Sequence, residues 1–343
     1  MSKYSKILTI VLIILAFGLR FYGLSARAPF DWDQDRDYSQ VQQIVSGKYV
    51  PLGPVAKGVG GFYLGSLYYY LLTPSYLLLS GDLLALPLTS IMLDAIVAGL
   101  LYLLLKRWLG NGPGLALSLL YSSSWLFIEA SRISWNVALV PLWSLLTLYA
   151  LSRVIEEHSK FHLYLLAILA GLTLHIHVTP IAVLPILLLF FLRHLHFPLS
   201  TWMKAIFIGL IPACPLALYD LQHSFYNLHL LRDFLGYRIR VDTGYSDMIG
   251  MALTKLGKVT SGIFLSQFRD SLMLGVGMII LAFFATFGRS LVVKISGLMV
   301  LLSTLLIILF RDYGFPEYYF GFAYIPLCVL LISAIFRYLH SLG

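Results

Sequence analysis

Four of the sixteen acidic residues of this chain lie within seven positions near its N-terminus. They are Asp31, Asp33, Asp35 and Asp37, and Arg36 lies between the last two. Carboxylates this close together raise one another's pKa values unless a cation lies among them. Such a cluster can supply a general base, bind a divalent cation such as Mg²⁺ or Mn²⁺, or do both. The alternative is a solvated acidic loop, but a cluster is unusual in a chain so poor in charge.

The spacing of these residues favours one of them as a base. If a helix runs from Asp33 to Gly47, Asp33 and Asp37 share one face, with Arg36 beside them. The apolar positions that follow would rest on a membrane and leave an acid over a membrane-facing cavity. We therefore expect Asp33 to be catalytic, with Asp31 as the second candidate, and Arg36 and Asp37 to bind substrate.

Further polar residues lie between the apolar segments. Arg132, at a membrane surface, needs a partner such as a phosphate or a carboxylate. Trp135 and Asn136 suit sugar recognition by ring stacking and amide hydrogen bonds, although Trp135 also fits an aromatic membrane anchor. His175 and His177 can share a side only in an extended turn, and metal ligation by this pair is the weaker interpretation.

A second polar group follows Tyr219. Asp220 and His223 are three residues apart and can share one helical face, and an interfacial histidine can bind phosphate or shuttle protons. A hydrogen-bonded interfacial pair without chemistry is the alternative. Arg232, Arg238 and Arg240 suit either phosphate recognition or the binding of anionic lipid headgroups.

The composition restricts the class of protein that can carry these residues. The chain has 343 residues, of which 59% are hydrophobic and only 12% charged, and its mean hydropathy is +0.85. These values exclude an ordinary soluble enzyme and a disordered chain. The net charge of +8 comes from basic residues placed singly or in pairs at the ends of apolar runs, so nucleic acid is not an expected partner. Cys214 and Cys328 lie inside apolar runs and indicate no metal site.

Long apolar runs predict an all-α polytopic membrane protein of about ten transmembrane helices, folded as a single integral domain over 1–343. The runs are 7–24, 62–80, 84–105, 113–129, 133–152, 162–176, 178–192, 202–220, 271–288, 291–310 and 318–336. The tyrosine-rich run 62–80, broken by Pro74, is predicted to lie in the interface, and an ordinary span is the alternative. We expect the first run to remain as an uncleaved helix.

Basic residues predict the orientation of these helices. If 62–80 does not cross, ten lysines and arginines of the short loops face the cytoplasm: Lys3, Lys6, Lys106, Arg107, Arg153, Lys160, Arg193, Arg289, Lys294 and Arg337. Both termini are then cytoplasmic, in a plasma-membrane protein. Two long loops, 25–83 and 221–270, face outside, with interfacial helices in the first. The short loop 311–319 is expected to cap a cavity on that side.

One series of residues resembles a known family. The first span ends Arg-Phe-Tyr-Gly-Leu, and Phe-Asp-Trp-Asp-Gln-Asp-Arg-Asp, a Gly-Pro pair and Tyr-Tyr-Tyr follow it. This series is similar to the GT-C membrane glycosyltransferases, and most similar to the family 39-type group of protein mannosyltransferases and lipid A aminoarabinose transferases. The resemblance covers about residues 10–235. Those relatives carry an acidic pair, usually Asp-Glu, which aligns with Asp33 and Gln34, so glutamine replaces the second acid here.

The resemblance implies an activity. A sugar would pass from a polyprenyl-phosphate-linked donor to a lipid, glycan or protein acceptor at the outer face of the membrane. Asp33 would take a proton from the acceptor, and the anomeric configuration would invert. Arg132, His175, His177, His223 or a divalent ion would stabilise the leaving phosphate. A transporter or flippase of a lipid-linked or small solute is the alternative, in which Asp94 or the turn His175–Thr179 would carry function.

Overall fold

Nearly all of the apolar runs fold as helices, because a helix satisfies every backbone polar group within its own segment. The computed structural model describes residues 3–56, 61–192, 196–239, 244–264, 270–310 and 316–342. The helices that correspond to the apolar runs are α1 (Lys3–Phe21), α4 (Leu67–Leu78), α5 (Ala85–Leu109), α6 (Asn111–Ser123), α7 (Trp125–Arg132), α8 (Val140–Glu157), α9 (Lys160–Leu172), α10 (Val178–Phe191), α11 (Leu199–Leu210), α12 (Cys214–Gln222), α15 (Leu272–Thr286), α16 (Leu291–Phe310) and α17 (Tyr324–Leu342). Short 3₁₀ helices lie between them: η1 (Asn136–Leu139), η2 (Thr173–His175), η4 (Ile211–Ala213) and η5 (Glu317–Ala323).

Within the described ranges, six helical segments are long and apolar enough to cross a membrane. They are Lys3–Phe21, Ala85–Leu109, Asn136–Glu157, Leu199–Gln222, Leu291–Leu309 and Glu317–Ser341. Shorter apolar helices cover Lys160–His175, Thr179–Phe191 and Leu272–Thr286. The prediction of a polytopic helical membrane protein is therefore confirmed, whereas the number of ten spans and their orientation stay predictions.

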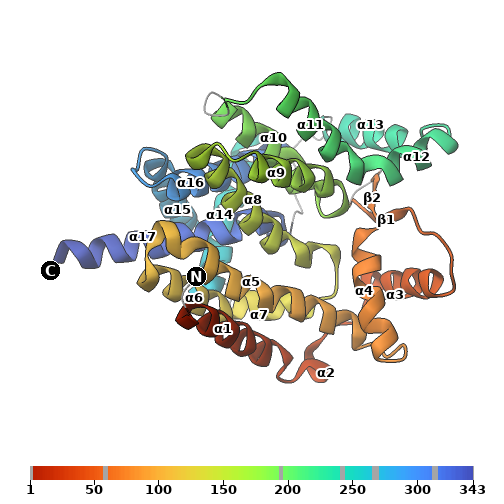
Figure 1. Ribbon diagram of the computed structural model, residues 1–343, viewed down its shortest axis with the longest axis horizontal. Coiled ribbons are helices and arrows are strands. Elements are labelled where there is room, and N and C mark those ends of the chain that lie inside the picture. Colours follow the sequence, from red (N-terminus) through yellow and green to blue (C-terminus); the bar gives the residue numbers. More distant parts are fainter. Residues whose placement is uncertain are drawn as a thin grey trace.

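The first predicted outer loop contains short elements that build one end of the molecule. They are α2 (Leu24–Arg27), α3 (Trp32–Val45), the antiparallel hairpin β1 (Leu52–Val55) and β2 (Tyr63–Gly65), and α4. The hairpin was not predicted. Twelve residues make α4 about 18 Å long, well short of the roughly 30 Å of a hydrocarbon core, in agreement with a segment that does not cross. These elements lie together at one end of the helix bundle, and α17 runs to the C-terminus at the other (Figure 1).

The segment 221–270, predicted as the second outer loop, contains two helices that the hydropathy pattern did not predict. They are α13 (Tyr226–Ile239) and α14 (Tyr245–Phe264). Met248, Ala252 and Leu256 bury one face of α14 in the main core, and α14 packs along α15. Polar residues on the other face lower its average hydropathy, so no continuous apolar run marks this helix.

An ion pair buried in the bundle joins α1, α5 and α6. Arg20 Nε lies 2.5 Å from Asp94 Oδ2, and the two side chains are 0% and 5% exposed. The hydroxyl of Tyr121 donates to the other oxygen of Asp94, and Arg20 also donates to the carbonyl of Ser122. Asp94 is therefore neutralised and hydrogen-bonded, which is the arrangement a buried carboxylate needs for stability.

Candidate functional site

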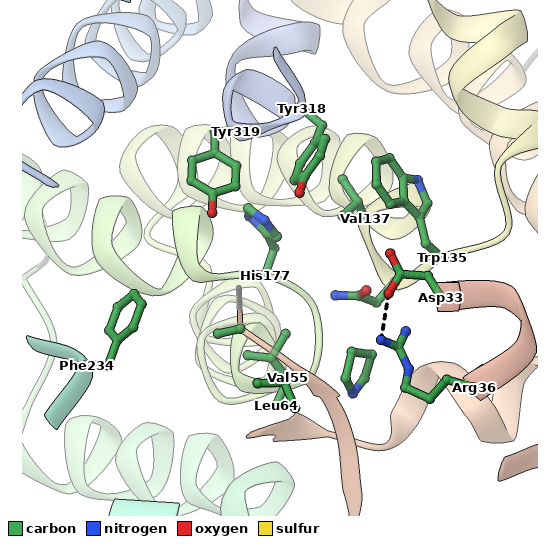
Figure 2. A pocket seen from close by; sticks show the side chains of 13 residues that line it. Asp33, Arg36, Val55, Leu64, Trp135, Val137, His177, Phe234, Tyr318 and Tyr319 are labelled. Atoms are coloured by element: carbon green, nitrogen blue, oxygen red, sulfur yellow. Dashed lines mark hydrogen bonds and ion pairs between the residues drawn. The ribbon is translucent and has the colours of Figure 1, made fainter. Parts of the chain in front are cut away.

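A cavity of about 400 Å³ lies where α3, the hairpin, η1 and η5 meet. This volume is within the range of small-molecule sites in proteins. Its lining residues are Asp33, Arg36, Pro54, Val55, Ala56, Leu64, Trp135, Asn136, Val137, His177, Phe234, Tyr318 and Tyr319 (Figure 2). Five residues predicted from the sequence as site residues are thus brought together from three distant segments: Asp33, Arg36, Trp135, Asn136 and His177.

The start of α3 sets which acid faces the cavity. Asp31 is the N-cap, and its Oδ1 accepts a hydrogen bond of 2.8 Å from the backbone N–H of Trp32. Gln34 Oε1 accepts from the N–H of Asp31 at 3.0 Å, which completes a capping box. Asp31 therefore caps the helix and does not line the cavity, whereas Asp33, two residues further along, does.

Gln34 also fixes α3 against the chain that carries Trp135 and Asn136. Its Nε2 donates a hydrogen bond of 2.8 Å to the carbonyl of Ser134, and the residue is 3% exposed. The Ser134 hydroxyl contacts the Tyr68 hydroxyl at 2.8 Å, which ties α4 to the same point. The resemblance implies an acid at position 34, but the glutamine found here has a structural role.

Arg36 lies between two carboxylates. Its Nη1 is 2.7 Å from Asp33 Oδ1, and its Nη2 is 2.6 Å from Asp37 Oδ1. The Asp33 side chain is 54% exposed, whereas that of Asp37 is fully buried. Burial raises the pKa of Asp37 to about 7 and outweighs the opposing effect of Arg36. The pKa of Arg36 is raised because these carboxylates outweigh its burial, so the guanidinium stays charged.

Aromatic rings form one wall of the cavity. The ring of Trp135 lies 4.5 Å from that of Tyr318, edge to face, and the ring of His177 lies 5.9 Å from Tyr318 and 5.3 Å from Tyr319. Figure 2 shows these side chains on the side of the cavity away from the hairpin. Asn136 adds an amide group, and its Nδ2 donates to the carbonyl of Ile176.

His177 is a neutral histidine in this wall. Its burial lowers the pKa to about 4. Nδ1 accepts a hydrogen bond of 3.3 Å from the backbone N–H of Thr179 and so caps α10. A neutral imidazole has one N–H donor and one acceptor nitrogen, so His177 contributes a hydrogen-bonding group and no positive charge to this wall.

The opposite side of the cavity is apolar. Val55, Ala56 and Leu64 of the hairpin line it together with Phe234 of α13, whose ring lies 5.5 Å from that of Phe62. The sequence analysis identified none of these residues, because an apolar side chain carries no sign of its role when the hairpin itself is not predicted. The cavity therefore has one polar, aromatic side and one apolar side.

Arg132 and His175 lie outside the cavity lining. Arg132 is 1% exposed and donates to the carbonyls of Leu19, Arg20 and Tyr22 at the end of α1, and its carboxylate partner is Glu129 at 2.5 Å. His175 Nε2 lies 2.7 Å from the carbonyl of Pro212, and its Nδ1 accepts from the N–H of Leu67 at 3.4 Å. Gly65 permits this packing, since a side-chain carbon there would overlap the imidazole. Arg132 therefore joins α7 to the end of α1, and His175 joins η2 to η4 and to the start of α4.

Asp220 and His223 also lie outside the lining. Asp220 Oδ1 accepts from the N–H of Asn227 at 2.7 Å, and Asn227 bonds the backbone of Tyr63 through both side-chain atoms. This chain of contacts holds α13, and with it Phe234, against β2. His223 stacks on Tyr219 with ring centroids 4.0 Å apart. Arg232 pairs with Asp233 at 2.9 Å on the surface, and Arg240 and residues 311–315 lie outside the described residues.

Among the residues that the structure describes, no group of three or more His, Cys, Asp or Glu side chains could hold a metal ion. The two carboxylates closest to such a role, Asp33 and Asp37, both bind Arg36.

Comparisons with known proteins show what this chain is similar to. The family model described as dolichyl-phosphate-mannose-protein mannosyltransferase matches residues 65–219. Two solved structures of ArnT from Cupriavidus metallidurans align with a TM-score of 0.67, one bound to undecaprenyl phosphate at 14% identity and one in the apo state at 13%. Each alignment covers 96% of this chain but only 60% and 59% of the ArnT chains, respectively. The comparison with curated proteins gives no match.

The fold and these likenesses define the class: the chain is a polytopic helical membrane protein whose fold is similar to that of ArnT. Within that class it is similar to the dolichyl-phosphate-mannose-protein mannosyltransferases over 65–219 and to ArnT over nearly its whole length. The resemblance inferred from the first outer loop is thereby confirmed. The chain spans about three fifths of the length of the ArnT structures it matches.

Proposed function

We propose that this protein transfers a sugar from a polyprenyl-phosphate-linked donor to an acceptor at the outer face of the plasma membrane. The observation that carries the proposal is the position of Asp33. Its exposed carboxylate faces a cavity that also holds Arg36 and a wall of aromatic and amide side chains. The ArnT structure bound to undecaprenyl phosphate supports a polyprenyl phosphate as the lipid part of the donor.

The two sides of the cavity suit the two parts of such a donor. A sugar ring fits the wall of Trp135, Tyr318 and His177, because aromatic faces stack on the C–H groups of sugars and neutral donors bind hydroxyls. The apolar side, with Leu64 and Phe234, fits the first isoprene units. Arg36 is the one cation among the described lining residues and is therefore the candidate ligand of the phosphate.

These positions support the following reaction. The Asp33 carboxylate takes the proton of an acceptor hydroxyl or amine while the acceptor oxygen or nitrogen forms a bond to the anomeric carbon. The bond from that carbon to the phosphate oxygen breaks on the opposite face, so the configuration inverts. Negative charge develops on the leaving phosphate, where the Arg36 guanidinium stabilises it. Arg36 can turn from Asp33 to the phosphate and still keep its contact with Asp37.

The test is donor consumption without a gradient. The full chain is placed in lipid nanodiscs with polyprenyl-phosphate hexoses, pentoses and aminosugars and a lipid-extract acceptor pool, with and without Mg²⁺ or Mn²⁺. Free polyprenyl phosphate is followed by mass spectrometry. We expect release from at least one donor. No release from any of them, together with gradient-driven solute flux in liposomes, would overturn the proposal in favour of a transporter.

A further inference from the structure

A second cavity lies at the end of the bundle away from Asp33. Its volume is about 530 Å³, and it is lined by Trp108, Leu109, Gly110, Pro113, Ser290, Val293, Ser333, Phe336, Arg337 and His340. These residues come from the C-terminal turn of α5, the first turn of α6, the start of α16 and the last turns of α17. Helix α17 connects the two cavities, since η5 precedes it and lines the first one, whereas the last turns of α17 line the second.

The polar groups of this second cavity are suited to an anion. Arg337 has no carboxylate within ion-pair distance in the part of the chain that the structure describes, and its guanidinium lies over the turn that begins α16. A side-chain carbon at Gly288 would lie 3.6 Å from Arg337 Nη2. The Ser333 hydroxyl is buried and has no hydrogen-bond partner among the described residues. A guanidinium and a hydroxyl are typical ligands of a phosphate.

Helix ends of both signs meet at this cavity. Helices α6 and α16 begin here, whereas α5 and α17 end here, so the helix dipoles largely cancel. The nearest acids are already bound: Glu157 pairs with Arg107 and Arg153, and Glu156 accepts a hydrogen bond of 2.6 Å from Trp108 Nε1. The described lining residues therefore include the cation Arg337 and no carboxylate.

The position of the cavity points to a lipid as the source of the anion. Helices α5, α16 and α17 are candidate membrane spans, so their ends lie at the depth of lipid headgroups. Trp108, Val293 and Phe336 provide apolar contacts for the glycerol part of a lipid. The distribution of basic residues predicts that this end is cytoplasmic, which is the side where anionic lipids attract lysine and arginine.

We propose that the cavity around Arg337 and His340 binds the phosphate of an anionic phospholipid headgroup. The site is separate from the sugar-transfer cavity, and its ligand is a lipid of the surrounding membrane rather than a substrate. Arg337 provides two parallel hydrogen bonds to phosphate oxygens, and the Ser333 hydroxyl donates a further one.

Native mass spectrometry of the detergent-purified full chain tests this proposal. The protein is titrated with short-chain phosphatidylglycerol, phosphatidylcholine and inorganic phosphate. We expect one phosphatidylglycerol to bind preferentially and Arg337→Gln to weaken it about tenfold or more. Arg289→Gln is the matched control, because Arg289 is exposed beside the cavity and does not line it. Its affinity should stay within about twofold of that of the wild type.

Arg337→Lys distinguishes a specific site from a loss of folding. This variant keeps the positive charge but not the paired hydrogen bonds, so its affinity should lie between those of the wild type and Arg337→Gln. Equal weakening by Arg337→Gln and Arg289→Gln would overturn the proposal, because it would indicate general surface charge. Equal binding of phosphatidylcholine, or displacement of the lipid by equimolar inorganic phosphate, would overturn the assignment to an anionic lipid.

Discussion

The side-chain amide of Gln34 donates a hydrogen bond of 2.8 Å to the backbone carbonyl of Ser134, across a sequence separation of 100 residues. Because Asp33 precedes Gln34, and Trp135 follows Ser134, this bond fixes the distance between the carboxylate and the aromatic wall of the cavity. The amide also accepts from the N–H of Asp31, so it orders the first turn of α3 as well. A glutamine can do both, since its side chain donates and accepts.

Gln34→Glu, which introduces the acid that the resemblance implies at this position, should destabilise the protein. A carboxylate cannot donate to the Ser134 carbonyl, and the site is buried, so the free energy of unfolding should fall by about 1–3 kcal/mol. Thermal unfolding of the purified protein at pH 8 measures the change. Gln42→Glu on the exposed side of α3 is the control. Equal thermal stability of the two variants would contradict a structural role for Gln34.

Asp37 should make stability depend on pH. Its pKa is about 7 in the folded protein and near 3.8 in the unfolded chain, because burial favours the neutral acid. The folded state therefore binds more protons between these values, and the free energy of unfolding should fall by a few kcal/mol as the pH rises from about 4 to about 7. Asp37→Asn should flatten this dependence, whereas Asp35→Asn should not. Denaturant unfolding at pH 5 and pH 8 measures the change in unfolding free energy. If this change were the same in Asp37→Asn as in the wild type, Asp37 would be excluded as the cause of the pH dependence.

Trp135 should contribute to donor binding rather than to the chemical step. Trp135→Ala removes one ring of the wall and should raise KM for the donor about three- to tenfold with little change in kcat. Trp135→Phe keeps an aromatic face and should recover most of the loss. Trp32, 87% exposed on α3 and outside the cavity, provides the control variant Trp32→Ala. Identical kinetics for Trp135→Ala and Trp32→Ala would show that the ring takes no part in binding.

Asp94 should matter for stability. Asp94→Asn leaves Arg20 as an unpaired charge inside the bundle and should cost about 3–5 kcal/mol of unfolding free energy. Adding Arg20→Met removes that charge and should restore much of the loss. A folded double variant that still consumes the donor would support a purely structural role for the Arg20–Asp94 pair. Loss of gradient-driven flux in a stable double variant would instead favour the transporter alternative.

Long apolar runs predicted the main helices because a membrane span needs a continuous hydrophobic surface. The run 84–105 became α5 (Ala85–Leu109) and the run 291–310 became α16. The amphipathic helix α14 was missed, although Met248, Ala252 and Leu256 recur every four residues along its buried face. A search for helical periodicity, rather than for average hydropathy, would have found it.

The candidate site was predicted in part. The acidic cluster indicated Asp33 and Arg36, because charge is rare in this chain and its placement is therefore informative. The sequence could not separate His177, which lines the cavity, from His175, which joins the start of α4 to η4. The two histidines are only two residues apart, and the turn between them decides which one lines the cavity. The apolar side of the cavity depends on a hairpin and on α13, whose positions follow from contacts between distant segments.

The most direct test of the central claim is single-turnover transfer by Asp33→Asn, with donor binding measured on the same protein. The amide keeps the shape of the side chain, and Arg36 keeps its contact with Asp37. We predict that transfer slows by about 10²- to 10⁴-fold, as expected for loss of a general base. Donor affinity should change less than about threefold, and Asp35→Asn should behave like the wild type. Transfer by Asp33→Asn at a rate similar to that of the wild type would contradict the assignment of Asp33 as the base.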